Sequence, residues 1–137
     1  MKILRIAATV ALLAATLPAL AQNQTQTPEQ QEKAVYEMIQ RQVDNMASAL
    51  DLEDWQIFYV DSILTHDYAG LQAELLALRN SKVTNQDQYI NVQDKWGEQI
   101  YNAIHGVLDE QQWQKYLKSG AGRDKKSRDK RAAKKGK

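Results

Sequence analysis

An apolar seam between Glu53 and Lys82 is the feature that most constrains how this chain can fold. Large apolar side chains recur there in steps of three and four, and no proline interrupts them: Ile57, Val60, Leu64, Tyr68, Leu71, Leu75 and Leu78. This spacing is typical of one stripe on a long α-helix, and about 30 residues at roughly 1.5 Å each make a rod of about 45 Å. A chain of 137 residues cannot surround such a rod on all sides. We therefore expect the rod to lie against another long helix, in the same chain or in a partner.

Three further helices are predicted around this rod. Residues 27–30 (TPEQ) combine a capping threonine, a proline at the first helical position and a capping-box glutamine, so a helix should run from about residue 28 to residue 49. A second should run from residues 84–85 to about residue 106, and a short one from residue 109 to about residue 120. No segment alternates as a strand does. The predicted fold is all-α, an elongated four-helix hairpin with long amphipathic helices.

The first 21 residues have the pattern of an export signal. Lys2 and Arg5 precede an apolar run of about 12 residues, and residues 19–21 (ALA) resemble a signal-peptidase site. That run is shorter than the roughly 20 apolar residues that a membrane span needs. We expect cleavage after Ala21, an exported protein, and a polar, disordered leader over residues 22–27. An uncleaved N-terminal anchor is the alternative.

Cysteine content and charge narrow the possible functions. The chain has no cysteine, which excludes disulfides, thiol catalysis and thiolate metal sites. The overall net charge of +1 is an average of two unlike parts, since residues 28–119 have fifteen Asp/Glu against seven Lys/Arg, and residues 120–137 have nine Lys/Arg against two Asp. The basic segment has no apolar residue larger than alanine, so we predict a helical domain over residues 28–119 and a disordered basic tail over residues 120–137.

Two of the predicted helix starts share one pattern: leucine, an acidic residue, two variable residues, glutamine and a large apolar residue. Its fixed positions are Leu52 and Gln56 in the first copy, and Leu108, Asp109 and Gln112 in the second. In the second copy the mechanism is clear, because an N-cap aspartate accepts from the Gln112 amide while the glutamine side chain reaches back to the N-cap amide. Any two capped helices can show this pattern, and that simpler interpretation stays open.

The two copies resemble the LTxxQ motif of the Spy/CpxP family of periplasmic stress proteins. Glu53 and Asp109 stand where that family has threonine; Asp109 keeps the capping chemistry, whereas Glu53 departs from it. The resemblance covers residues 28–119. It implies a periplasmic location and an elongated helical hairpin that dimerises into a cradle-shaped, ATP-independent chaperone. In related family members it implies a repressor of stress signalling or a metal-responsive protein.

No arrangement of reactive side chains indicates an enzyme, a cofactor or a metal site. His66 and His105 are the only histidines, and neither belongs to a zinc-ligand spacing, although His66 with Asp67 and another acid is an alternative. Phe58 and Tyr101 lie off the main stripes of their helices. They are therefore our candidates for contact with unfolded clients.

We expect the protein to be a homodimer that binds unfolded or membrane protein clients without ATP. The basic tail favours an anionic membrane surface over nucleic acid, because an exported protein seldom meets nucleic acid. Two alternatives stay open: a regulator or sensor that docks on a membrane signalling protein, and a metal-responsive binding protein that uses His66.

Overall fold

The structure is a computed structural model that describes residues 26–136. The expected export signal, its cleavage after Ala21 and most of the polar leader lie outside these residues. Within them the protein is all-α, as predicted, and contains no strand. The helices are α1 (Pro28–Leu50), α2 (Asp54–Asn80), α3 (Gln86–His105), α4 (Glu110–Tyr116) and α5 (Gly122–Lys135), with a π-helical turn over Leu117–Ala121.

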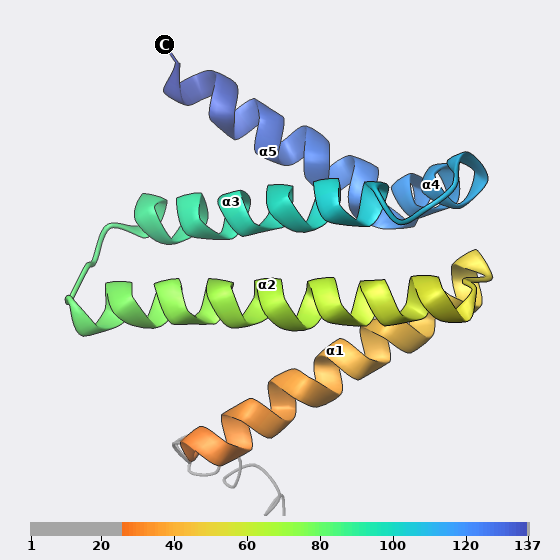
Figure 1. Cartoon of the computed structure of the whole chain (residues 1–137). Coiled ribbons are helices and arrows are strands. Elements are labelled where there is room, and N and C mark those ends of the chain that lie inside the picture. Colours follow the sequence, from red (N-terminus) through yellow and green to blue (C-terminus); the bar gives the residue numbers. More distant parts are fainter. Residues whose placement is uncertain (1–25, 137) are drawn as a thin grey trace, which may run out of the picture.

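The four long helices lie in one layer (Figure 1). Helices α2 and α3 run antiparallel side by side, α1 crosses the other side of α2, and α5 crosses the outer side of α3. The C-terminal half of α1 contacts α2, and its N-terminal half diverges from α2 toward Pro28. The predicted rod is a single helix of 27 residues, about 40 Å long.

Local capping explains where α1 and α3 begin. At the start of α1 the Thr27 hydroxyl accepts from the Gln30 amide at 3.2 Å, and the Gln30 side chain accepts from the Thr27 amide at 3.0 Å. At the start of α3 the Asn85 side chain accepts from the Asp87 amide at 2.9 Å. These bonds satisfy amides that have no partner within the helix.

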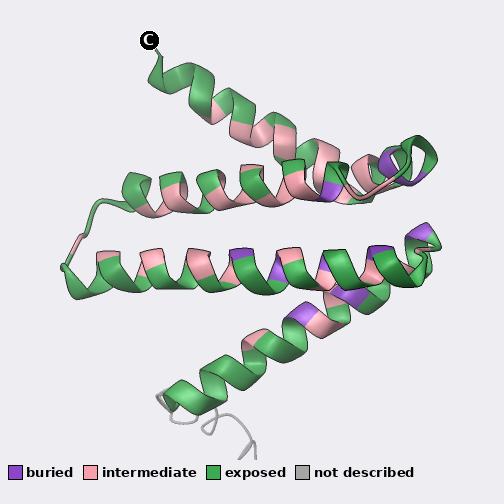
Figure 2. Ribbon diagram, in the orientation of Figure 1, coloured by how far each residue is buried: buried purple, intermediate pink, exposed green. Residues whose placement is uncertain are grey.

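The core is small and lies near one end of the layer. Its buried members come from three helices: Ile39 and Val43 of α1, Val60 and Leu64 of α2, and Ile104 of α3. Figure 2 shows the buried residues gathered where α1 meets α2 and around α4. Farther along α2 the seam residues Leu71, Leu75 and Leu78 are only half-buried, so much of the rod has apolar side chains that reach solvent.

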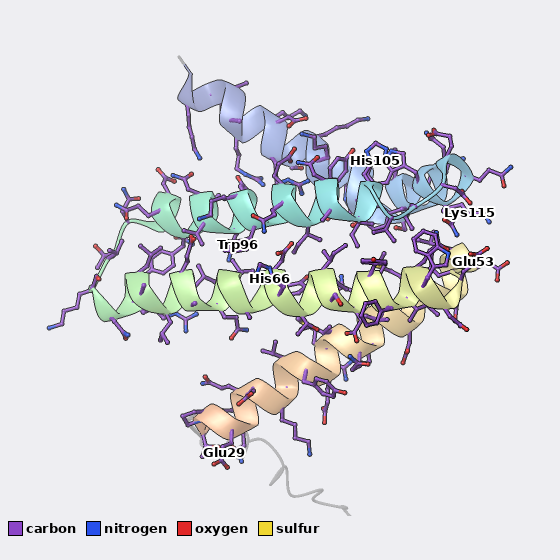
Figure 3. All side chains as sticks on the ribbon, viewed as in Figure 1. Glu29, Glu53, His66, Trp96, His105 and Lys115 are labelled. Carbon is purple, nitrogen blue, oxygen red and sulfur yellow. The ribbon has the colours of Figure 1, made fainter. Side chains whose placement is uncertain are left out.

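A glycine lets α2 and α3 approach closely. Trp96 of α3 lies between the two helices (Figure 3), and its six-membered ring occupies the space where a Cβ at Gly70 of α2 would be. Any larger residue at position 70 would overlap that ring. The separation of the two helices therefore depends on this one glycine.

The prediction of a disordered basic tail is wrong for residues 122–135, which form α5. The helix is held by ion pairs to acidic residues of α3. Arg131 donates to both carboxylate oxygens of Asp94 at 2.7 Å, and Lys125 and Arg128 donate to Glu98 at 2.7 and 3.2 Å. The prediction considered only apolar burial, whereas a basic helix can be ordered by a matching row of carboxylates.

Candidate functional site

The two copies of the repeated motif meet inside the protein. Gln56 and Gln112 are 4% and 8% exposed, although 56 positions separate them in the sequence. Their carboxamides exchange two hydrogen bonds. Gln56 Nε2 donates to Gln112 Oε1 at 2.7 Å, and Gln112 Nε2 donates to Gln56 Oε1 at 3.0 Å.

Each glutamine also holds the start of its own helix. The Gln56 carbonyl oxygen accepts from the Glu53 amide at 2.9 Å, and the Gln112 oxygen accepts from the Asp109 amide at 3.0 Å. The remaining N–H of Gln56 donates to the Val107 carbonyl at 3.0 Å, and that of Gln112 to the Leu50 carbonyl at 3.3 Å. Both carboxamides thus use two donors and two acceptor positions, which satisfies a buried amide.

The other motif positions support this junction. Asp109 accepts from the Gln112 amide at 2.8 Å, as a capping aspartate should. Leu52 and Leu108 are half-buried and pack against the core. Glu53 behaves differently, because its carboxylate accepts from the Trp55 indole N–H at 2.6 Å. The junction has no reactive geometry, and what it does is fix the starts of α2 and α4 against the end of α1.

The two residues suggested for client contact have different surroundings. Phe58 is 68% exposed, and Trp55 and Tyr59 lie beside it on α2 with exposures of 52% each. The ring centres of Phe58 and Tyr59 are 5.7 Å apart, and those of Trp55 and Tyr59 are 6.2 Å apart. These three aromatic residues form an exposed group, and their spacing of three and four along one helix is the signal that could have identified it.

Tyr101, the second candidate, lies beneath α5. It is half-buried, and its ring packs edge-on against Trp113 at 4.9 Å. Lys125 Nζ lies 5.6 Å from the centre of the same ring and Arg128 Cζ lies 5.5 Å from it. Cations at this distance are attracted to the face of an aromatic ring, so Tyr101 contributes to the docking of α5.

Two open grooves flank the N-terminal half of α1, where it diverges from α2. One has a volume of about 530 Å³ and is lined mainly by Val35, Met38, Leu71, Leu75 and Leu76. The other, of about 410 Å³, is lined by Tyr36, Ile39, Ala69 and again Val35. Both arise because the two helices separate before their apolar stripes end.

Neither histidine belongs to a group of three possible metal ligands among residues 26–136. His66 Nδ1 lies 2.8 Å from Asp67 Oδ1, and the buried Asp67 carboxylate also accepts from Gln99 of α3 at 2.9 Å. His105 stacks on Trp113 with ring centres 3.9 Å apart. Over residues 26–136 no group of three or more His, Cys, Asp or Glu side chains could hold a metal ion. Over the same range, no helix is both long and apolar enough to cross a bilayer.

Comparison with known proteins found no relative of this chain. No family model matches the chain, and neither a curated protein nor a solved structure is similar to it. The resemblance of the two motifs to the LTxxQ pattern therefore rests on the motif residues themselves.

Proposed function

We propose that this protein is a periplasmic, ATP-independent, chaperone-like protein that binds unfolded or aggregation-prone chains on the apolar surface of α1 and α2. One observation carries the proposal. All the large hydrophobic side chains that are exposed among residues 26–136 belong to these two helices: Tyr36, Met38, Trp55, Phe58, Tyr59 and Leu76. Exposed apolar side chains that occur on two neighbouring helices, and on no other described element, are typical of a binding surface.

The chemistry of this surface suits clients of varied sequence. Aromatic and methionine side chains provide large contact areas with adaptable geometry. The grooves beside α1 are open and mainly apolar, whereas a site for one small molecule usually encloses its ligand and adds a few precisely placed polar groups. An open surface of this kind favours binding without strict selection.

The proposal includes the finer features that the motif resemblance implies. They are a Spy/CpxP-like elongated hairpin, export to the periplasm, and a homodimer. The antiparallel α2–α3 pair and the two motif copies at helix starts support the hairpin. The homodimer rests on the motif resemblance, because the exposed apolar surface of α1 and α2 is assigned here to clients.

An aggregation assay tests the proposal. A chemically denatured client is diluted into buffer without ATP, with the processed protein (residues 22–137) in molar excess, and light scattering is followed. We expect suppression of scattering. The variant Tyr36→Ser/Phe58→Ser/Leu76→Ser should need at least about a tenfold higher concentration, because burial of even one such side chain contributes about 1.5–3 kcal/mol.

A matched control removes polar side chains from another surface. Gln88, Gln93 and Asn102 are exposed on α3, and their triple replacement by serine should leave the suppression unchanged. Unchanged scattering with the unmodified protein in excess would remove the chaperone proposal. Equal losses in the two triple variants would remove the assignment to α1 and α2.

A further inference from the structure

Helix α5 has basic side chains on two of its faces. Carboxylates of α3 pair with the basic residues of only one face. At 100° per residue, Lys125, Arg128 and Arg131 lie on the face toward α3, where they pair with Glu98 and Asp94. Lys135 of the same face donates to Asn91 of α3. Pairing with Arg131 lowers the pKa of Asp94, and pairing with Lys125 lowers that of Glu98, so these carboxylates stay charged at neutral pH.

The outer face of α5 has its own row of cations. Lys126, Lys130 and Lys134 follow one another at intervals of four residues, with Arg123 three residues before them, within an arc of about 80° on the helix. All four are exposed. Among the described residues no ion pair joins the three lysines to a carboxylate. We call Lys126, Lys130 and Lys134 the outer lysine row.

The outer row is made of lysines alone, whereas the inner face has two arginines and two lysines. Arginine pairs with carboxylates in a fixed, two-pronged geometry, which Arg131 and Asp94 show. Lysine is a hydrated point charge on a flexible stem. The arginines of the inner face thus suit a fixed position against α3, and the outer row suits attraction to a surface without fixed geometry.

We propose that the outer lysine row binds the headgroups of an anionic phospholipid bilayer, with α5 lying parallel to the membrane surface. The row is straight, spans about 12 Å and lies at the edge of the layer of helices, so a flat surface can reach all three lysines. It contains no apolar residue, and the contact is therefore electrostatic with no insertion into the bilayer. Residues 122–135 include no aromatic side chain to stack on bases, which disfavours single-stranded nucleic acid.

The expected strength follows from the number of lysines. Each basic residue near an anionic leaflet raises the partition coefficient about fivefold, so the row of three contributes roughly 100-fold. Because the attraction falls off within a Debye length, binding should weaken steeply as salt is added.

The test is cosedimentation of the processed protein with vesicles of phosphatidylcholine and phosphatidylglycerol, and with vesicles of phosphatidylcholine alone. We expect binding only to the anionic vesicles. Lys126→Gln/Lys130→Gln/Lys134→Gln should reduce the partition coefficient by about 100-fold, and the corresponding triple arginine variant should keep it. Circular dichroism of each variant checks that the helical content is unchanged.

A control of equal charge separates the row from net charge. Lys33, Lys82 and Lys115 are exposed outside α5, and their triple replacement by glutamine should change the partition coefficient by less than about threefold. Equal effects of the two glutamine variants would overturn the proposal, as would equal binding to neutral vesicles.

Two other outcomes would also overturn it by assigning the row to another partner. One is binding to an oligonucleotide with no binding to anionic vesicles. The other is a salt-dependent dimer, seen by sedimentation, that the outer glutamine variant loses while vesicle binding is absent.

The lipid proposal does not depend on the chaperone proposal, because the outer glutamine variant should suppress aggregation of an uncharged client as the unmodified protein does.

Discussion

Replacing Gln56 with alanine removes four hydrogen bonds from the buried junction of the two motifs. They are those with the Glu53 amide and the Val107 carbonyl, and the two exchanged with Gln112. At about 1 kcal/mol of net stabilisation each, and with part of the Gln112 carboxamide left without a partner, the free energy of unfolding should fall by about 4–5 kcal/mol. Gln112→Ala also removes four bonds, including the same two, and should cost a similar amount.

The double variant is the informative one. Because the two exchanged bonds are lost in either single variant, the pair of changes removes six distinct hydrogen bonds and not eight. The double variant should therefore be about 2 kcal/mol more stable than the sum of the single effects implies. This difference of about 2 kcal/mol arises because the two carboxamides contact each other directly.

Urea unfolding followed by far-ultraviolet circular dichroism measures these free energies. All variants should be compared in the same concentration of a stabilising osmolyte, because a small domain has only about 5–10 kcal/mol to lose. Gln111→Ala is the control, since Gln111 is exposed beside Gln112 and its loss should cost less than about 0.5 kcal/mol. Effects of Gln56→Ala and Gln112→Ala that add within about 0.5 kcal/mol would refute the reasoning.

Two further predictions concern the packing of α3 against its neighbours. Gly70→Ala should destabilise the protein by about 2 kcal/mol in the same urea measurement, because the new methyl group overlaps the Trp96 ring. Gly97→Ala is the control and should be neutral or stabilising, because the nearest atom to its new methyl group, in the Arg128 side chain, is 3.4 Å away. The pKa values of Asp94 and Glu98 are lowered in the folded protein. The two ionised carboxylates therefore stabilise the fold at a pH above their ordinary pKa values of about 4. This stabilisation is lost as the pH falls through the lowered pKa values. Far-ultraviolet ellipticity should therefore decrease on acidification below about pH 4, and Asp94→Asn/Glu98→Gln should show less of this decrease; an equal decrease in that variant would contradict the assignment.

The helix positions could be predicted from the sequence because their signals are local. The start of α1 follows from residues 27–30, and the unbroken seam of α2 predicts one long helix. The buried contact between Gln56 and Gln112 could not be predicted in this way. The sequence predicts Gln112 as part of a cap and Gln56 as its counterpart in the repeated pattern, but neither position indicates anything about a residue 56 positions away. Only the tertiary arrangement brings the two helix starts together.

The same limit explains the error at the C-terminal segment. Composition shows that residues 122–135 have little to bury, which is correct, since none of them is fully buried. It does not show that Asp94 and Glu98 lie on α3 at the spacing that receives Arg131 and Lys125. Order in α5 comes from the fit between two charged surfaces, and that fit is a property of both helices together.

The order of helices across the layer separates charge. Helix α1 has four acidic and two basic side chains, and α5 has eight basic and two acidic ones; these two helices form opposite edges of the layer in Figure 1. The protein therefore has a permanent electric dipole directed across its helices. In the field of a negatively charged surface a molecule with such a dipole rotates before it makes contact. The edge formed by α5 would arrive first, and the grooves between α1 and α2 would face the bulk solution.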